Sequence, residues 1–398
     1  MDISRVFVRK CRSAVWHAQN QLELWRRSAQ EKRRNRIAEK WIDNLRRQPP
    51  QVLVGANFVD LGGTRMHMHS IQKYSSLKVT LAPEESIMKV FSPGEFVGRF
   101  GESFNSIETS QIQAVHSHVF PFFIEWCRNA RKKQGTRWIH THHNWYYPEF
   151  GKNGIEEWQA QFNNAFLMAA TEADVCLCVS RGQQKFLLRE FGIKTYHLPN
   201  GVDLEACRRG CAESWRELTG IQPGFILFVG RNDPVKDPEF FVQLAQLMPD
   251  HRFVIAGQGI SHSVIEEEWK LKVPGNLEVL GQLSHIEVQH AIAACSVLVL
   301  CSRREGLPTL VMEGIVAGKP VVVPDEEGCM EVIGNGQYGF IYRAKDYQDC
   351  IRQVELATQD RKISASAKTY ASKTYNWPSI LEKLDHLYLG GSPVPVVD

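Results

Sequence analysis

The second half of the chain repeats one pattern, in which a short apolar run is followed by a segment with helical periodicity. The apolar runs are FILFVG (225–230), FVIAG (253–257), LEVLG (277–281), VLVLC (297–301) and PVVV (320–323). The helical segments between them lie near 238–248, 263–272, 285–294 and 309–317. Because each crossover through a helix returns the chain in the same direction, such strands form parallel sheets covered by helices. The pattern predicts an α/β fold.

The first half carries the same alternation less clearly. Apolar runs such as VLVGANF (52–58) and DVCLCVS alternate with helical segments near 155–172 and 181–191. A chain of 398 residues is too long for one ordinary core. We therefore predict two Rossmann-like domains, residues 51–205 and 206–372, which face a central cleft and are joined near 203–220. In such sheets ligands bind at the carboxyl ends of the strands.

Composition excludes several classes of protein. The hydrophobic content of 43% and the charged content of 23% are typical of a globular protein. No apolar run reaches the roughly 20 residues of a membrane span, and the N-terminus lacks the apolar core of a secretory signal. We expect a cytoplasmic location. The ten cysteines show no zinc-binding spacing, so we expect buried, reduced thiols.

Residues 1–50 form a basic extension, which we predict to be helical. They hold 13 Lys or Arg against 5 Asp or Glu, which gives a net charge of +8. Ile37, Trp41 and Leu45 recur every four residues and would form one apolar stripe. Such a helix can lie on an anionic membrane, here the inner face, as a peripheral contact through residues 26–47. The alternative is a solvated helix packed on the body of the protein or on a partner, and the sequence leaves both open.

Two groups of residues in the first half follow strands. Gly62 and Gly63 lie between the first strand and a helix, where backbone amides can approach a phosphate or a sugar, although a plain turn explains the pair as well. Histidines in VHSHVFPFF and IHTHHNW lie at the cleft edge. No spacing of the HExxH kind and no DxD triplet accompanies them, so we predict no metal. A neutral histidine that hydrogen-bonds a sugar hydroxyl or a backbone carbonyl fits better.

The stretch LFVGRNDPVKDPEFF brings two cations to the start of a helix. The strand leads to Gly230 and Arg231, and Lys236 follows five positions later. A guanidinium, an ammonium and a helix dipole together make a diphosphate site. The alternative is a solvated basic loop.

The stretch SRREGLPTLVMEGIVAGKPVVV (302–323) places Glu305 before a helix and Glu313 inside it. Over a fully helical interval the two would lie roughly 12 Å apart, whereas the acid and base of a glycosidase need roughly 5–9.5 Å. The free amides at Leu307, Thr309 and Leu310, around the first-turn Pro308, could bind a phosphate. The spacing therefore favours one long ligand across the helix start.

These linked motifs resemble retaining GT-B glycosyltransferases, specifically glycosyltransferase family 4 (glycosyl transferases group 1). SRREGLPTLVME resembles the E-x7-E signature, GRNDPVKDP the phosphate loop, and LPNGVD the turn between domains. YNWPSILEKLDHLY resembles the helix that crosses back to the N-terminal domain, which would place a crossover helix and tail at 373–398. The resemblance covers roughly residues 51–390.

The resemblance implies a role for each matching residue. Arg231 and Lys236 would hold the donor diphosphate, Glu313 the ribose hydroxyls and Glu305 the donor sugar. His143 would lie near the C6 hydroxyl of the sugar. The residues implied in catalysis are His143, Glu305, Arg231 and Lys236. The residues implied in donor binding are Gly62, Gly63, Gly230, Arg231, Lys236, Glu305, Gly306, Leu307, Pro308, Thr309, Leu310 and Glu313.

The implied function is a metal-independent, hexosyltransferase-type reaction without a cofactor. It would move a sugar from a nucleotide-diphosphate sugar to a glycan or lipid-linked acceptor in polysaccharide or glycoconjugate synthesis, and nucleic acid is not expected as a partner. The alternatives are a GT-B nucleotide-sugar epimerase and a non-catalytic scaffold that binds a nucleotide sugar or glycan. The sequence departs from the family pattern at Asn144, at Asp237 and at Glu327-Gly328.

Overall fold

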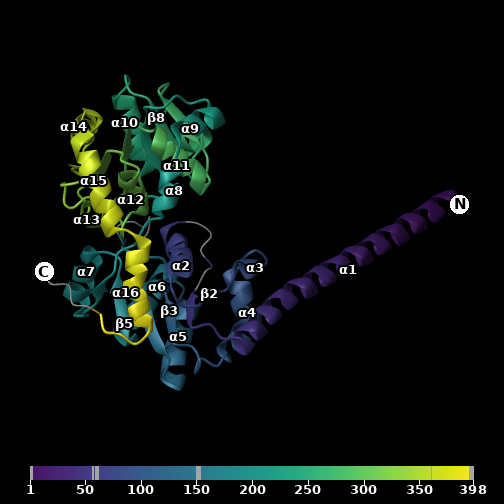
Figure 1. Cartoon of the computed structure of the whole chain (residues 1–398). Coiled ribbons are helices and arrows are strands. Elements are labelled where there is room, and N and C mark those ends of the chain that lie inside the picture. Colours follow the sequence, from purple (N-terminus) through teal and green to yellow (C-terminus); the bar gives the residue numbers. More distant parts are fainter. Residues whose placement is uncertain (1–2, 56–57, 59–61, 149–153, 360, 394–398) are drawn as a thin grey trace.

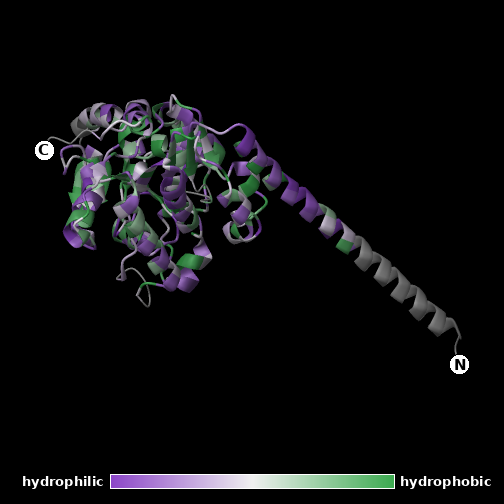
Figure 2. Cartoon of the chain, turned by 90° about the horizontal axis from the view of Figure 1, so that it is seen from below, coloured by the Kyte–Doolittle hydropathy of each residue, from purple (hydrophilic) through white to green (hydrophobic). Residues whose placement is uncertain are grey.

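The protein consists of two α/β domains, one above the other in Figure 1. The structure is a computed structural model, and it describes residues 3–55, 58, 62–148, 154–359 and 361–393. Each domain is built on one parallel six-stranded sheet. Apolar residues gather in the interior, as the hydropathy colouring of Figure 2 shows. The predicted α/β fold with two facing domains is confirmed.

The N-terminal sheet has the strand order β2-β1-β3-β4-β5-β6. Val52 and Val54 of β1 pack into one buried cluster and Leu53 into another, so helices cover both faces of the sheet. The strands are β1 (Val52–Gly55), β2 (Val79–Ala82), β3 (Ala114–Ser117), β4 (Arg137–His142), β5 (Val175–Cys178) and β6 (Tyr196–His197). The helices are α2 (Gly63–Tyr74), α3 (Glu85–Met88), α4 (Pro93–Asn105), α5 (Pro121–Gln134), α6 (Glu157–Glu172) and α7 (Arg181–Phe191).

The C-terminal sheet has the order β12-β11-β10-β7-β8-β9, and helices α8 (Leu204–Arg208) and α9 (Ala212–Thr219) precede it. The strands are β7 (Ile226–Val229), β8 (Phe253–Ala256), β9 (Leu277–Leu280), β10 (Val297–Val299), β11 (Val321–Pro324) and β12 (Phe340–Tyr342). The helices are α10 (Pro238–Leu247), α11 (His285–Ala294), α12 (Thr309–Val316), α13 (Glu327–Val332), α14 (Tyr347–Gln359) and α15 (Arg361–Thr374).

One helix of the sequence analysis is shorter than predicted. Near 263–272, where a helix is expected, the chain forms a single π-helical turn over Val264–Glu268. Lys270 then adopts a left-handed backbone with φ 57°, which a continuing helix cannot contain. Pro274 also disfavours the helical conformation for the residue before it. The connection between β8 and β9 is therefore mostly irregular.

The last helix, α16 (Trp377–Tyr388), returns to the N-terminal domain, as predicted. Its apolar side packs with Val52, Val54 and Met68 in one buried cluster. The carboxylate of Asp385 accepts hydrogen bonds from the hydroxyls of Ser75 and Ser76, at 2.6 and 2.7 Å. Helix α16 thus ties the end of the chain to the domain where the chain begins.

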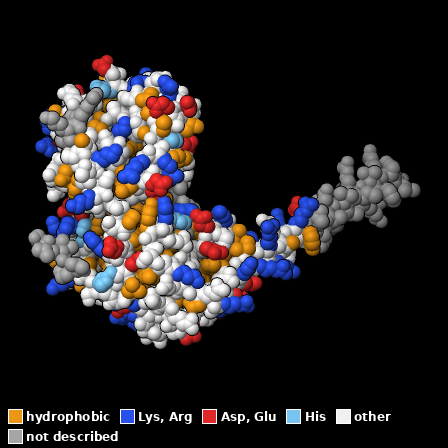
Figure 3. All heavy atoms as spheres, in the orientation of Figure 1, with side chains coloured by type: hydrophobic (Ala, Val, Ile, Leu, Met, Phe, Trp, Pro, Cys, Tyr) orange, Lys and Arg blue, Asp and Glu red, His pale blue; other side chains and the backbone are white. Residues whose placement is uncertain are grey.

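The basic extension forms one long helix, α1 (Ile3–Arg47). The C-terminal end of α1 lies against the body of the protein, and the helix points away from the body toward its N-terminal end (Figure 1). Trp41 and Leu45 are buried, and the Trp41 ring stacks on Phe104 with centroids 5.7 Å apart. The apolar stripe therefore packs on the body of the protein, and a peripheral membrane contact through residues 26–47 stays a prediction. Figure 3 shows Lys and Arg side chains along the part of α1 next to the body.

No helix among the described residues is both long enough and apolar enough to cross a membrane. Nine described cysteines carry free thiols, and eight of them are buried, as the sequence predicts. Burial raises the pKa of the Cys127, Cys176 and Cys301 thiols well above the usual value, which makes them poor nucleophiles.

Candidate active site

A cleft of about 780 Å³ lies between the two domains at the carboxyl ends of their strands. The N-terminal domain lines it with residues that follow β4 and with the starts of α6 and α7. The C-terminal domain lines it with loops that follow β7, β10 and β11. The crevice beyond the carboxyl ends of parallel strands is where ligands bind in such folds.

A cation and a carboxylate from two loops meet in this cleft. The ammonium of Lys236, on the loop after β7, lies 2.5 Å from a carboxylate oxygen of Glu305, on the loop after β10. Arg231 is paired at 3.0 Å with Asp233, and its side chain is 54% exposed. The structure thus brings Lys236, Arg231 and Glu305 together on one side of the cleft, as expected for a site that binds both a diphosphate and a sugar.

Asp237, where the family commonly has glycine, adopts a left-handed backbone with φ 49°. Glycine populates that conformation without strain, and aspartate is one of the few other residues that tolerate it. The Asp237 carboxylate accepts a hydrogen bond at 2.7 Å from the Nε of Arg303. This departure from the family pattern therefore preserves the shape of the loop.

Helix α12 begins at Thr309, directly after Pro308, and no side chain caps it. Its first amides are therefore available to a ligand. The carbonyl of the preceding Leu307 accepts a hydrogen bond from the Asn200 amide at 3.3 Å. A side chain on Gly63 would lie 3.7 Å from the Thr309 hydroxyl, so Gly63 faces this helix start from the other domain.

Glu313, on α12, contacts two side chains of α11 and lies beside the 780 Å³ cleft rather than among the residues that line it. One of its carboxylate oxygens lies 3.4 Å from His285 Nε2, and the other accepts a hydrogen bond from Gln289 at 2.9 Å. The hydrogen bond to Glu313 raises the pKa of His285 above the usual value. Sequence reasoning missed both partners, although they lie four positions apart on one helical face.

Two glycines allow close backbone approaches at the site. A side chain on Gly306 would overlap the carbonyl oxygen of His143, which belongs to the opposite domain. A side chain on Gly328 would lie 2.6 Å from the carbonyl oxygens of Glu305 and Gly306. The loops that carry these residues are therefore packed too closely for any other amino acid.

Gly230 and Gly62 have different environments. A side chain on Gly230 would lie 2.8 Å from the Phe228 ring, so this glycine lets the loop after β7 fold back on its own strand. Gly62 has φ 102° and precedes the first residue of α2, with open space around it. The positive φ is the reason for glycine there.

His143 lies behind the cleft surface, in contact with two other histidines. Its Nε2 lies 2.9 Å from His118 Nδ1, and its ring centroid lies 4.9 Å from that of His67. Burial holds the pKa of His143 well below the usual value, so the imidazole is neutral at pH 7. A neutral imidazole can hydrogen-bond a sugar hydroxyl without carrying charge. Sequence reasoning missed His67, which belongs to a helix rather than to a strand end.

The structure therefore divides the predicted site residues into two groups. Those that line the 780 Å³ cleft are Arg231, Lys236, Glu305 and Gly306. Those that lie around it are Gly62, Gly63, His143, Gly230, Leu307, Pro308, Thr309, Leu310 and Glu313. Arg304, which the sequence analysis did not single out, also lines the cleft, and its guanidinium lies 4.2 Å from the centre of the Tyr147 ring.

Comparisons with known proteins identify one family along most of the chain. The family profile described as glycosyl transferases group 1 matches residues 213–374, and the profile described as glycosyltransferase family 4 matches residues 89–206. An Escherichia coli UDP-Gal:alpha-D-GlcNAc-diphosphoundecaprenol alpha-1,3-galactosyltransferase is 25% identical over 228 residues, which is 53% of this chain and 58% of the relative. An uncharacterised glycosyltransferase of Methanocaldococcus jannaschii is 26% identical over 71% of this chain and 77% of its own length.

Solved structures show the same fold. A sucrose-phosphate synthase from Thermosynechococcus elongatus superposes with a TM-score of 0.67 at 16% identity, over 85% of this chain and 97% of that chain. HepE from Anabaena, in complex with UDP and glucose, superposes with a TM-score of 0.66 at 17% identity, over 84% of this chain and 98% of that chain.

Proposed function

The chain belongs to glycosyltransferase family 4 and has the GT-B fold, and from this premise we propose that it moves a sugar from a nucleotide-diphosphate sugar to a glycan or lipid-linked acceptor. We propose further that the transfer retains the configuration of the sugar, is of the hexosyltransferase type and requires no metal. The observation that carries the proposal is the meeting of Lys236 and Glu305 beside the uncapped start of α12.

The pairing of Lys236 with Glu305 supports a simple exchange on donor binding. A diphosphate carries more negative charge than one carboxylate, and a charge-assisted hydrogen bond to it is strong. Lys236 would therefore leave Glu305 for the diphosphate, and the freed carboxylate would accept hydrogen bonds from the hydroxyls of the donor sugar. Arg231 is more than half exposed and would leave Asp233 in the same way.

The start of α12 would hold the other side of the diphosphate. The amides of Thr309 and Leu310 and the positive end of the helix dipole favour an anion at this point. Glu313 would bind the ribose, since its carboxylate is already oriented by Gln289 and His285. Glu305 and Glu313 would thus serve opposite ends of one nucleotide sugar.

The transfer would proceed by breaking the bond between C1 of the sugar and the diphosphate oxygen, which keeps the electron pair. Lys236, Arg231 and the helix start would stabilise the negative charge that grows on that oxygen, which lowers the barrier. The acceptor hydroxyl would attack C1 from the same face, and its proton would pass to the leaving phosphate. No protein nucleophile is required, and His143 would hold the C6 end of the sugar.

A lipid-linked or glycan acceptor is supported by the other wall of the cleft. Trp145, Tyr146, Tyr147, Trp158 and Phe186 line it from the N-terminal domain. Aromatic rings present broad apolar faces with polar tips, which suits the apolar face of a sugar ring. The name of the Escherichia coli relative states a sugar on diphosphoundecaprenol as its acceptor, and we propose an acceptor of this class for the present chain.

A hydrolysis screen of nucleotide sugars tests the proposal before any acceptor is known. We expect the purified protein to hydrolyse one nucleotide sugar slowly, with release of the nucleoside diphosphate, and expect Lys236→Ala to slow this release. NMR of the first product should show the anomer of the donor. The absence of both hydrolysis and binding across UDP, GDP, ADP and dTDP sugars would contradict the proposal.

A further inference from the structure

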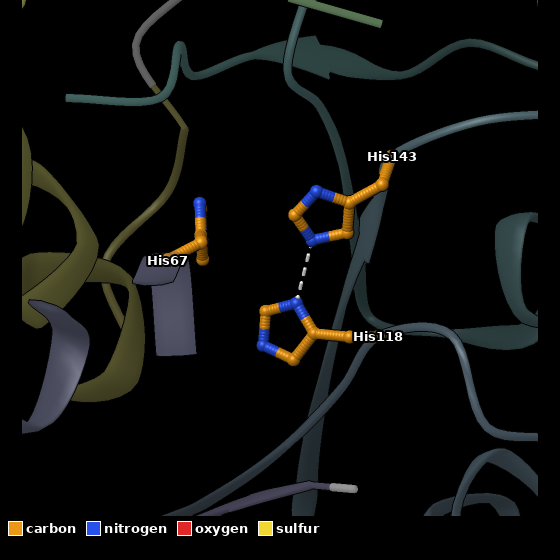
Figure 4. Close-up of side chains that lie close together, drawn as sticks. All are labelled: His67, His118 and His143. Carbon is orange, nitrogen blue, oxygen red and sulfur yellow. Dashed lines mark hydrogen bonds between the residues drawn. The ribbon is translucent and has the colours of Figure 1, made fainter. Parts of the chain in front are cut away.

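Three histidines from three different elements lie close together (Figure 4). His67 comes from α2, His118 directly follows β3, and His143 directly follows β4. Each offers a ring nitrogen, and these nitrogens all lie within 4.8 Å of one another. We propose that this histidine cluster binds a divalent transition metal ion, with zinc as the best fit, and that the bound ion blocks the donor site.

The hydrogen-bond pattern of His67 leaves one nitrogen ready to bind a metal. Its Nδ1 lies 2.8 Å from Oδ1 of Asn200, while Nδ2 of Asn200 donates to the Leu307 carbonyl. Because the amide oxygen can only accept, Nδ1 of His67 carries the hydrogen and Nε2 carries the free lone pair. That Nε2 is buried and has no hydrogen-bond partner in the described part of the chain.

Asn200 therefore accepts the second ring N–H of His67, as outer hydrogen-bond partners do in metal sites. Metal-binding histidines almost always donate their second ring N–H to an oxygen, which fixes the tautomer and the orientation of the ring. A histidine that serves packing alone gains nothing from a buried lone pair without a partner, since an unpaired buried polar atom costs free energy. A bound ion would satisfy the His67 lone pair.

His118 and His143 supply the other two ligands. Their facing nitrogens lie 2.9 Å apart and share one hydrogen atom. In a tetrahedral zinc site the metal lies about 2.0–2.1 Å from each nitrogen, which places ligand nitrogens roughly 3.4 Å apart. The short pair would lengthen by a few tenths of an ångström. The shared hydrogen would move to the other nitrogen of its own ring, so no proton need leave the site.

The charge state of the histidine cluster also suits a metal. Burial lowers the pKa of His67 to about 4 and holds those of His118 and His143 well below the usual value. All three rings are therefore neutral at pH 7 and need lose no proton to coordinate an ion. Three imidazoles and one open position are a zinc ligand set, whereas magnesium and calcium prefer oxygen.

The metal site and its inhibitory effect rest on different premises. The site rests on the three histidines and Asn200 alone. The inhibition rests on the proposed function, because His143 is the residue that we assign to the C6 end of the donor sugar. An ion that fixes His143 against His67 and His118 would withdraw it from the donor. Such an ion would regulate the transfer and would take no part in the chemistry.

Calorimetry with zinc chloride on the full-length, untagged, chelator-treated protein tests the site. We expect one ion per chain in the wild type. We expect affinity for zinc to fall at least about 100-fold in His67→Gln and in His118→Gln, since even outer partners cost about 10–100-fold when removed. In Asn200→Ala, which removes an outer partner, we expect the affinity for zinc to fall about 10–100-fold. His69→Gln is the matched control, because His69 lies two residues along the same helix and is directed instead toward Glu85 at 3.9 Å.

Cobalt gives a readout that does not depend on the folding of any variant. The wild type loaded with Co²⁺ should show the intense visible absorption of four-coordinate cobalt. Weak absorption typical of six water ligands would overturn the site, as would equal zinc affinity in His67→Gln and His69→Gln. Donor hydrolysis that is unchanged at saturating zinc would overturn the inhibition. If no donor is hydrolysed even without metal, the proposed function fails while the cobalt spectrum still decides the metal site.

Discussion

The two domains build their sides of the cleft from different chemistry. The C-terminal domain presents ion pairs on loops, among them Lys236 with Glu305 and Arg231 with Asp233. Behind its aromatic wall, the N-terminal domain holds buried, neutral histidines that hydrogen-bond one another or a neighbouring side chain. Charged loop groups can exchange one partner for another in water at low cost, whereas buried polar groups depend on the partners that they have.

This difference predicts two kinds of mutant. Substitutions among the loop cations should weaken ligand binding and leave the free energy of unfolding almost unchanged. Substitutions in the histidine network should lower the free energy of unfolding first.

Gly306→Ala should have the largest effect, because its methyl group would overlap the carbonyl oxygen of His143 and hold the two sides of the cleft apart. A displacement of about 1 Å at a catalytic site can cost about 100-fold in rate. We expect donor hydrolysis to fall by about that factor in steady-state kinetics. Gly98→Ala is the control, since Gly98 lies in α4 with open space around it. Equal activity of the two variants would show that the close approach does not matter.

Lys236→Ala should weaken nucleoside diphosphate binding by about 1.5–3 kcal/mol, the usual contribution of a charged hydrogen bond. Arg231→Ala should do the same. Calorimetry with the nucleotide that the hydrolysis screen selects measures both. Lys89→Ala serves as the control, since Lys89 directly follows α3, is 75% exposed and does not line the cleft. Unchanged nucleotide affinity in both cleft variants would contradict the assignment of Lys236 and Arg231 to the donor diphosphate.

Tyr388→Phe should lower the free energy of unfolding by about 1–3 kcal/mol, because it removes the partner of a buried histidine nitrogen. The Tyr388 hydroxyl lies 2.6 Å from His116 Nδ1, and both residues are almost fully buried. Urea unfolding measures the change, and Tyr196→Phe, at a residue that is 39% exposed, is the control. Nucleotide affinity should stay the same. A Tyr388→Phe protein as stable as wild type would contradict the claim that the buried histidine network stabilises the N-terminal domain.

Gln289→Leu should have the smallest effect, about 1 kcal/mol in nucleoside diphosphate affinity, since it removes the hydrogen bond that orients Glu313. Inorganic pyrophosphate lacks a ribose, so its affinity should not change. Calorimetry with the two ligands separates these expectations. An equal loss for pyrophosphate would mean that Glu313 does not serve the ribose.

The difference between the two domains also explains which site residues could be predicted from the sequence. The C-terminal site comes from two continuous stretches, 225–237 and 302–313, in which each functional residue follows a strand. Local pattern was enough to find it. The histidine cluster joins positions 67, 118 and 143, and Asn200 comes from yet another loop. No local spacing connects them, so only the order of the strands in the sheet brings them together.

Parts of the fold were missed for local reasons. Strand β2 and helix α4 were not named, although Ser92, Pro93 and Glu95 form a capping box with proline in the first turn. That signal was present and could have been used. The membrane alternative for Trp41 could not be decided from the sequence, because an apolar stripe looks the same whether it faces a bilayer or the Phe104 ring.

A crystal structure of the chain with the nucleotide sugar that it hydrolyses tests the central claim most directly. We expect the diphosphate between the Lys236 ammonium and the amides of Thr309 and Leu310, with the sugar against Glu305 and the ribose at Glu313. A donor bound elsewhere, or one bound while Lys236 remains paired with Glu305, would contradict the claim.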